Sequence, residues 1–232
     1  MGVGGSESAP CRVATRVEVR YDPVFELSTG RLAGADAAAG DLLGRGGGGG
    51  DEVLALVRSV LDDLRRRPAA LDRWWVCVEV GLAPLVDRSL CAELDLLQRT
   101  SGGLASRLRF GLDQGDVALA SVAGGLGRLV EHGARLDVGG AGAPVVPGSL
   151  GPVPVSTVRV QVATFDPRDG ASGLMLASLV GRARTLGIDV VAVGIDDDAH
   201  LDLAQRSGVG LVQGPWLGTG GSLEKLLTIR SR

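Results

Sequence analysis

The chain has 232 residues, of which 45% are hydrophobic, enough to bury the core of one large domain. The formal net charge of −3 argues against a nucleic-acid or anionic-membrane surface. The three cysteines are widely spaced, and neither His132 nor His200 has a partner at metal-ligand spacing, which argues against a His-based zinc site or a hydrolytic triad. Because no apolar run approaches the roughly 18 residues of a membrane span and the N-terminus lacks signal-peptide features, we expect a cytoplasmic protein.

Short apolar stretches alternate with helical periodicity along most of the chain. Residues 1–12, rich in Gly and Ser, predict a disordered tail, and 13–232 predict a single domain. The predicted strands are 17–21, 32–37, 74–80, 107–112, 134–138, 157–160, 188–193 and 210–212. The predicted helices are 51–67, 85–99, 116–131, 172–186, 199–207 and 222–229. Continuous apolar strands that alternate with amphipathic helices imply a mostly parallel sheet, and this number of units suits a closed barrel.

Three local features refine this expectation. The first two strands flank the turn 28–30 and can pair as an antiparallel hairpin, which an ordinary (β/α)8 barrel lacks. In the predicted helix 172–186, core spacing is shown by Met175, Leu179, Ala183 and Leu186. The glycine run 46–50 predicts an extended or poorly ordered linker, since it lacks the Lys-Ser/Thr of a phosphate-binding loop.

Residues 21–40, Y-D-P-V-F-E-L-S-T-G-R-L-A-G-A-D-A-A-A-G, resemble the opening of an EAL domain, the bacterial cyclic-di-GMP phosphodiesterase family, with its Y-Q-P-[IV] strand, T-G turn and G-A-E-A-L-x-R return. Further landmarks follow in order as far as about Thr228, including P-V-S-x-V-R, V-V-A-V-G-I and L-V-Q-G. The resemblance implies an α/β fold, the EAL-type modified (β/α)8 TIM-like barrel with an antiparallel first hairpin. It also implies a site at the strand ends where carboxylates and one Asn hold two metals that activate water against a phosphodiester.

The resemblance also shows which functional side chains this chain has changed. Three positions that supply metal-binding oxygens in the family hold Gly111, Val138 and Val193. The remaining acidic positions are Asp36 for the family Glu, Glu79 for the ligand Asn, and Asp137, which is retained. Hard cations need several oxygen ligands, so the loss of three donors predicts that the Mg²⁺ or Mn²⁺ site is not intact and that no cofactor binds.

Other departures concern catalysis and substrate binding. Arg159 stands at the catalytic Lys position and cannot serve as a proton-transferring ammonium, Gln213 is kept, and Gly40 replaces an Arg that would engage a phosphate. The surviving polar residues also have structural interpretations. Asp36 and Asp137 suit hydrogen-bonded strand ends, Glu79 suits a pair with Arg159, and Gln213 suits a turn cap.

We therefore expect a degenerate EAL domain, with vestigial site positions and no catalytic residues, that acts as a regulatory protein-interaction module in cyclic-di-GMP signalling. Cyclic-di-GMP binding is expected to be weak or absent. The alternatives are a non-catalytic cyclic-di-GMP receptor with a pocket around Asp36, Arg159 and Gln213, and a phosphodiesterase with residual activity. A protein partner or self-association is expected, with no nucleic acid and no membrane. The apolar loop 143–155, through Val145 and Val146, is the predicted interaction surface.

Overall fold

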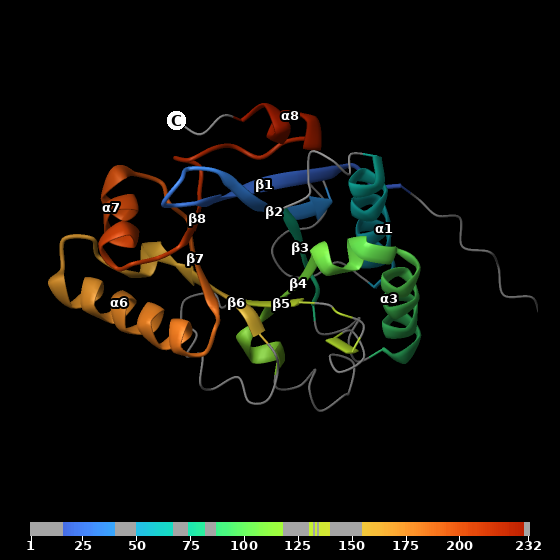
Figure 1. The fold of residues 1–232 in the computed structure, drawn as a ribbon, viewed down its shortest axis with the longest axis horizontal. Helices are drawn as coiled ribbons and strands as arrows, with labels where there is room; N and C mark the ends of the chain where they lie inside the picture. Colours follow the sequence, from blue (N-terminus) through green and yellow to red (C-terminus); the bar gives the residue numbers. More distant parts are fainter. Residues whose placement is uncertain are drawn as a thin grey trace, which may run out of the picture.

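The computed structural model describes residues 16–39, 50–66, 74–81, 87–117, 130–131, 133, 135–139 and 155–229. Eight strands in this part of the chain close into one barrel in sequence order (Figure 1). The strands are β1 Val19–Glu26, β2 Leu32–Ala39, β3 Trp75–Glu79, β4 Leu108–Asp113, β5 Arg135–Gly139, β6 Val155–Gln161, β7 Asp189–Val193 and β8 Leu211–Gln213. The predicted barrel is confirmed.

Strand β1 is antiparallel to both of its neighbours, while all the other adjacent strands are parallel. This confirms the predicted antiparallel hairpin. Val19, the first residue of β1, pairs with Ala39, the last residue of β2. The start of β1 therefore lies at the mouth of the barrel, the end where the parallel strands finish.

The described helices surround this barrel. Figure 1 shows α1 and α3 on one side, α6 and α7 on the opposite side, and α8 beside β1. Their bounds are α1 Gly50–Arg66, α3 Arg88–Thr100, α6 Gly170–Thr185, α7 Asp198–Arg206 and α8 Leu223–Thr228, with short 3-10 turns η2 Gly102–Arg107 and η4 Val162–Thr164. Asp169, Asp197 and Ser222 cap α6, α7 and α8 by accepting backbone N–H groups. No helix in the described ranges is long and apolar enough to span a membrane.

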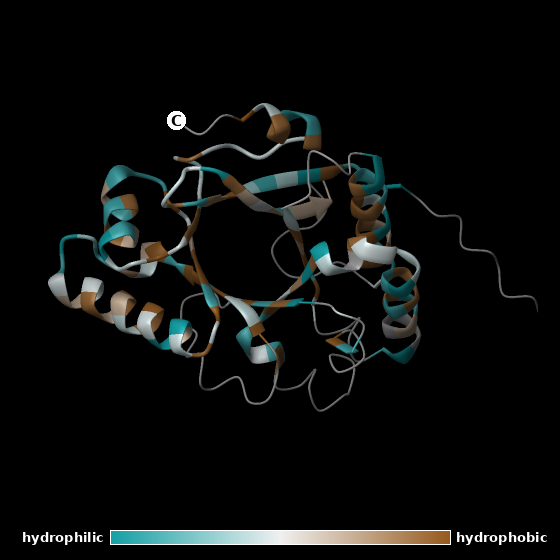
Figure 2. Cartoon of the chain, viewed as in Figure 1, coloured by the Kyte–Doolittle hydropathy of each residue, from teal (hydrophilic) through white to brown (hydrophobic). Residues whose placement is uncertain are grey.

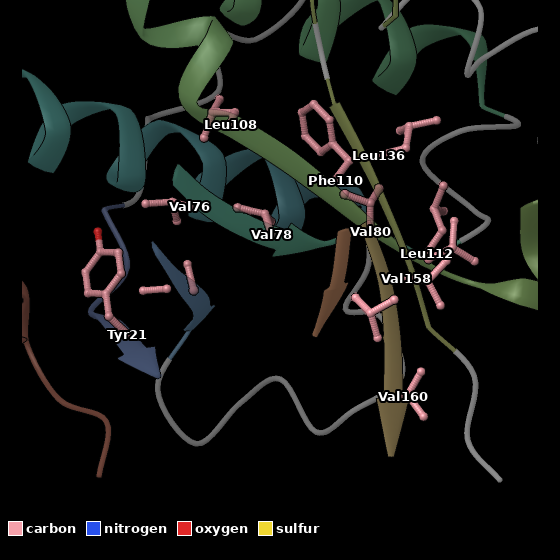
Figure 3. Close-up of a cluster of buried hydrophobic side chains, with 14 of the residues drawn as sticks. Tyr21, Val76, Val78, Val80, Leu108, Phe110, Leu112, Leu136, Val158 and Val160 are labelled. Carbon is pink, nitrogen blue, oxygen red and sulfur yellow. The ribbon is translucent and has the colours of Figure 1, made fainter. Parts of the chain in front are cut away.

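Side-chain alternation along the strands creates two apolar layers. The larger layer lies between the strands and the helices, and Figure 3 shows part of it, including Val76 and Val78 of β3, Phe110 of β4 and Val158 of β6. The smaller layer lies inside the barrel and consists of Val24, Trp75, Cys77 and Val191. Figure 2 shows the apolar character of the strands around the ring. The alternation of side chains along each strand thus separates a helix-facing apolar core from a barrel interior that also carries charged side chains.

The predicted core face of α6 is partly wrong. Leu179 and Ala183 are buried as expected, but Met175 and Leu186 are 58% and 56% exposed. The side chains that complete the buried face are Leu176 and Val180. Because α6 is apolar around most of its circumference, the spacing of its apolar residues does not single out the face that packs on the barrel.

Several predictions lie outside the described residues: the tail 1–12, glycines 46–49, and the loop residues Val145 and Val146. Gly50 is the first residue of α1, so the glycine run is not extended at its last position. The predicted helix 116–131 is described only at its two ends, with helical residues at 114–117 and 130–131.

A substitution at Gly34 tests how tightly the side chains inside the barrel are packed. A Cβ atom at this position would lie 2.4 Å from the ring of Trp75 and 2.6 Å from its carbonyl oxygen. We expect Gly34→Ala to lower the free energy of unfolding by about 1–3 kcal/mol, as overpacking does. Gly103→Ala is the matched control, because a Cβ there meets nothing within 4 Å and its φ is not positive. Equal urea midpoints for the two variants would contradict this packing.

Candidate functional site

The barrel brings seven of the eight predicted site positions to one face of the sheet. Strand register links them in series: Glu79 pairs with Gly111, Gly111 with Asp137, and Asp137 with Thr157. Directly paired residues point to the same face, and so do residues two apart on one strand. Asp36 pairs with Cys77, which is two residues before Glu79 on β3. Thr157 is likewise two residues before Arg159 on β6. Arg159 pairs with Val191, which is two residues before Val193, and Val193 pairs with Gln213. This face is the barrel interior.

Asp36 is held by two neighbours that reach it across the mouth. Nη1 of Arg159 donates to Oδ2 of Asp36 at 2.5 Å, and Nη2 donates to Oδ1, which makes a bidentate pair. Nε2 of Gln213 donates to the same Oδ2 at 2.8 Å and to the backbone oxygen of Asp22 at 3.2 Å. The partner of Arg159 is thus Asp36, where the sequence suggested Glu79. Burial acts to lower the pKa of Arg159, but the Asp36 carboxylate opposes this and holds it above its ordinary value.

Asp137 lies deeper and is fully buried. Its Oδ1 is 3.5 Å from Nη1 of Arg109, and its Oδ2 is 4.0 Å from Nε of Arg159. Neither oxygen accepts a well-formed hydrogen bond from the described residues, although the Thr157 hydroxyl is close enough to help lower the pKa of the carboxyl. Burial raises this pKa above its usual value, while Arg109 and Arg159 act to lower it.

Arg109 is a site residue that the sequence analysis missed. Its guanidinium lies 4.0 Å from the centroid of the Trp75 ring, and its Nη1 donates to Oγ1 of Thr157 at 2.5 Å. Burial lowers the pKa of Arg109, and Asp137 opposes the shift. The signal was present in the sequence, because Arg109 is two residues before Gly111 on the same strand and therefore shares its face.

A third pair lies at the rim. Asp22 pairs directly with Asp36 across β1 and β2, so both point to the same face. Arg20, two residues earlier on β1, donates to Oδ1 of Asp22 through Nε and Nη2, at 3.2 and 3.0 Å. Three interior or rim carboxylates, Asp22, Asp36 and Asp137, therefore each have an arginine beside them.

The positions that lack an oxygen donor differ in their surroundings. Gly111 faces inward, since a Cβ there would lie 3.1 Å from Sγ of Cys77. Val193 packs against the inner apolar cluster. Val138 is different: it is fully buried in the helix-facing cluster with Leu136 and Val158. The structure therefore does not bring Val138 together with the other seven predicted positions, because alternation along β5 turns it to the opposite face from Asp137.

A two-metal centre does not fit these residues. Both oxygens of Asp36 are engaged by Arg159, and Asp137 is enclosed between two guanidiniums. Gly111 and Val193 offer no donor atom, so the side chains of this face do not supply the several oxygen ligands that each of two divalent cations needs. In the described ranges, the one cluster of three potential ligands lies elsewhere: Asp196, Asp197 and His200 at the start of α7. There Nδ1 of His200 is 2.9 Å from each carboxylate, and Asp197 is the α7 cap.

Solved structures that resemble this fold include several EAL domains. The EAL domain of Mycobacterium smegmatis DcpA is 16% identical, with a TM-score of 0.76 over 90% of this chain and 95% of that one. The Xanthomonas citri FimX EAL domain in complex with c-diGMP is 15% identical, with a TM-score of 0.72 over 93% and 90%. The EAL enzyme Bd1971, bound to cAMP and cyclic-di-GMP, is 15% identical with a TM-score of 0.75 over 91% of this chain, which spans 64% of the Bd1971 chain.

At the level of sequence, a search of curated proteins finds no significant match. The sequence profile of the EAL domain matches residues 53–219, well over half of the chain, and this range contains β3 to β8 with six of the seven interior site positions. The eight-stranded barrel, its antiparallel β1 and the profile agree: this chain belongs to the EAL domain family.

Proposed function

We propose that this chain is a catalytically inactive EAL domain that acts in the cytoplasm as a regulatory protein-interaction module in cyclic-di-GMP signalling. The observation that carries the proposal is the bidentate pair between Arg159 and Asp36, to which Gln213 adds a third hydrogen bond. An acidic position that would hold a metal in the family is already neutralised by a side chain of the protein itself.

Arg159 blocks a metal by both charge and geometry. A guanidinium stays protonated in proteins and offers only donors, so it cannot become a ligand itself. A divalent cation bound at Asp36 would lie within a few ångströms of this fixed positive charge, and the repulsion would be strong at a site where Arg159 is only 8% exposed. Binding would therefore require Arg159 to leave Asp36 and remain buried without its partner.

The buried charged groups around Asp36 are poorly suited to the proton chemistry of hydrolysis. A water nucleophile needs a metal or a general base to remove its proton. The buried cations Arg109 and Arg159 cannot accept a proton. Asp137 is fully buried beneath the mouth, where a substrate phosphodiester has no direct access. These residues stabilise the interior as ion pairs and offer no route to an activated water.

Nucleotide binding follows the same logic. Two of the three solved structures described above contain the dinucleotide, Bd1971 as cyclic-di-GMP and the FimX EAL domain as c-diGMP. This binding is a property of those two proteins. In this chain the mouth presents Asp22 and Asp36, each already paired, and the phosphate-binding Arg of the family is replaced by Gly40, outside the described residues. A ligand with two phosphates would have to compete with Asp36 for Arg159. We therefore propose weak or absent binding.

The Arg159–Asp36 pair can be tested by a double-mutant cycle in urea. We expect Arg159→Met to lower the free energy of unfolding by about 3 kcal/mol, since it leaves carboxylates without their cation. Adding Asp36→Leu should restore a large part of this loss. Arg65→Met is the control, because it breaks the exposed Arg65–Asp62 pair and should cost less than about 1 kcal/mol. Additive effects of the two site substitutions would show that the pair does not act as a unit.

The absence of catalysis is tested with cyclic-di-GMP and Mg²⁺ or Mn²⁺. We expect no turnover above a control without protein, and no change in melting temperature when either metal or EDTA is added. Turnover that disappears in the isosteric variant Asp36→Asn, with an unchanged circular dichroism spectrum, would instead identify a phosphodiesterase with residual activity.

Calorimetric titration with cyclic-di-GMP, with and without Mg²⁺, separates the interaction module from the receptor. We expect no heat change corresponding to a dissociation constant of about 10 µM or tighter, and no difference between the wild type and Arg159→Ala. Micromolar binding that is lost in Arg159→Ala, but kept in the surface variant Arg65→Ala, would replace the proposed function with that of a receptor.

A further inference from the structure

The turn that joins β7 to α7 brings three potential metal ligands together (Figure 1). Nδ1 of His200 lies 2.9 Å from Oδ1 of Asp196 and 2.9 Å from Oδ1 of Asp197, and the three donor atoms all lie within 4.8 Å of one another. The side chains of Asp196 and Asp197 are 58% and 54% exposed, whereas that of His200 is 15% exposed. A largely enclosed imidazole nitrogen thus faces two carboxylates that solvent can reach.

The distances match the spacing of ligands around one metal ion. Zinc lies about 2.0–2.1 Å from an imidazole nitrogen and about 2.0–2.2 Å from a carboxylate oxygen. Two such donors, at the angles of octahedral or tetrahedral coordination, are therefore about 2.9–3.4 Å apart. Both distances from Nδ1 of His200 fall at the lower end of this range. Rotation of the two exposed carboxylates is sufficient to complete the coordination, without any movement of the backbone.

The backbone that carries these ligands is held in place by the neighbouring strand. The N–H groups of Gly194 and Ile195 both donate to the carbonyl oxygen of Gln213, at 2.9 and 3.0 Å, and the N–H of Trp216 donates to the carbonyl oxygen of Ile195 at 3.1 Å. Ile195 is fully buried. Because Asp196 follows directly, its position is fixed by contacts that do not involve the three ligands, as a preorganised site requires.

Helix capping explains only part of this arrangement. Asp197 is the cap of α7, and its Oδ1 accepts the backbone N–H of His200 at 2.8 Å. This cap needs neither the carboxylate of Asp196 nor the imidazole ring. Exposed ion pairs add little to stability, so the pairing of His200 with two acids is not explained by the folding of α7.

We propose that Asp196, Asp197 and His200 bind one divalent transition-metal ion of the Zn²⁺, Co²⁺ and Ni²⁺ class. His200 binds through Nδ1 and each aspartate through one oxygen, which leaves a coordination position for water. Two carboxylates and a neutral imidazole match the charge of a divalent ion. An imidazole among the ligands favours these metals over Mg²⁺ and Ca²⁺, which take oxygen ligands.

The bound ion would join the turn after β7 to the first turn of α7, outside the charge pairs of the barrel interior. Its affinity should be moderate, because the ligands are exposed and the N-terminal end of a helix carries partial positive charge. We expect a dissociation constant for Zn²⁺ on the order of 10 µM, and weaker binding of Mn²⁺, which is low in the affinity order of such sites. At this affinity the purified chain retains no metal, so the test of the interior with Mg²⁺, Mn²⁺ and EDTA is unaffected.

Calorimetric titration of the untagged chain with Zn²⁺ tests the site, in a background with Cys11 and Cys91 replaced by Ser. We expect one ion per chain and a dissociation constant that rises at least tenfold in Asp196→Asn and in His200→Gln. Asp197→Ser should cause a similar loss. Because serine is also a good helix cap, a loss of binding in that variant does not come from an unfolded α7.

Two control variants separate this cluster from other acidic or histidine residues. Asp202→Asn removes an exposed carboxylate from α7 two residues beyond His200, where helix geometry directs it away from the cluster. His132→Ala removes the other histidine of the chain. Both variants should bind Zn²⁺ as the parent does. Titration with Co²⁺ should produce visible absorption bands in the parent and not in His200→Gln.

A dissociation constant for Zn²⁺ above about 1 mM would overturn the proposal. So would binding that survives all three site substitutions, or binding that is lost in His132→Ala. None of these measurements involves nucleotide or turnover, and the proposed metal site does not rest on the proposed function. The metal site can therefore fail while the non-catalytic function stands, and the hydrolysis assay can fail independently of the metal site.

Discussion

The structure depends on the pairing of charge inside a closed barrel. Arg109, Arg159 and Asp137 are nearly or fully enclosed, and an isolated charge in such a place costs several kcal/mol. The interior tolerates them because Asp137 lies between the two guanidiniums and Asp36 takes both Nη atoms of Arg159. If an EAL barrel kept these acids without metals or arginines, the carboxylates would repel one another. The arginines therefore do structurally what cations would do in an intact site.

This arrangement sets the layout of the interior from bottom to top. Gly34 leaves space for the Trp75 ring, the ring supports the Arg109 guanidinium, and Arg109 contacts both Thr157 and Asp137. Above them Arg159 spans to Asp36, and Arg20 closes the series at the rim with Asp22. The two deeper pairs, which involve Arg109 and Arg159, are buried parts of the core, whereas the Arg20–Asp22 pair is exposed at the rim.

The strands and their order could be predicted from the sequence because each strand is a short apolar run between turn signals, and the predicted ends differ from the observed ones by only a few residues for most strands. For the site, the sequence predicted which positions lie near the strand ends, but it did not predict which side chains point inward or which ones pair. The resemblance to the family suggested Val138, whereas in this structure the side chain of Val138 lies in the helix-facing cluster. The pairing of Arg159 with Asp36 was not predicted, because the reach of a side chain across a closed barrel depends on strand stagger, which no sequence pattern gives. Arg109 was missed because its role depends on three other strands.

Enzymes commonly keep strained or unpaired groups at their active sites, at a cost in stability. In this chain Asp36 and Asp137 of the interior, and Asp22 at the rim, each lie beside an arginine. The features that the single molecule leaves unsatisfied lie on its outside, on α6, where Leu174 and Met175 face solvent and Gly181 lacks a packing partner. The buried charges are therefore satisfied within the molecule, whereas these apolar side chains of α6 face outward.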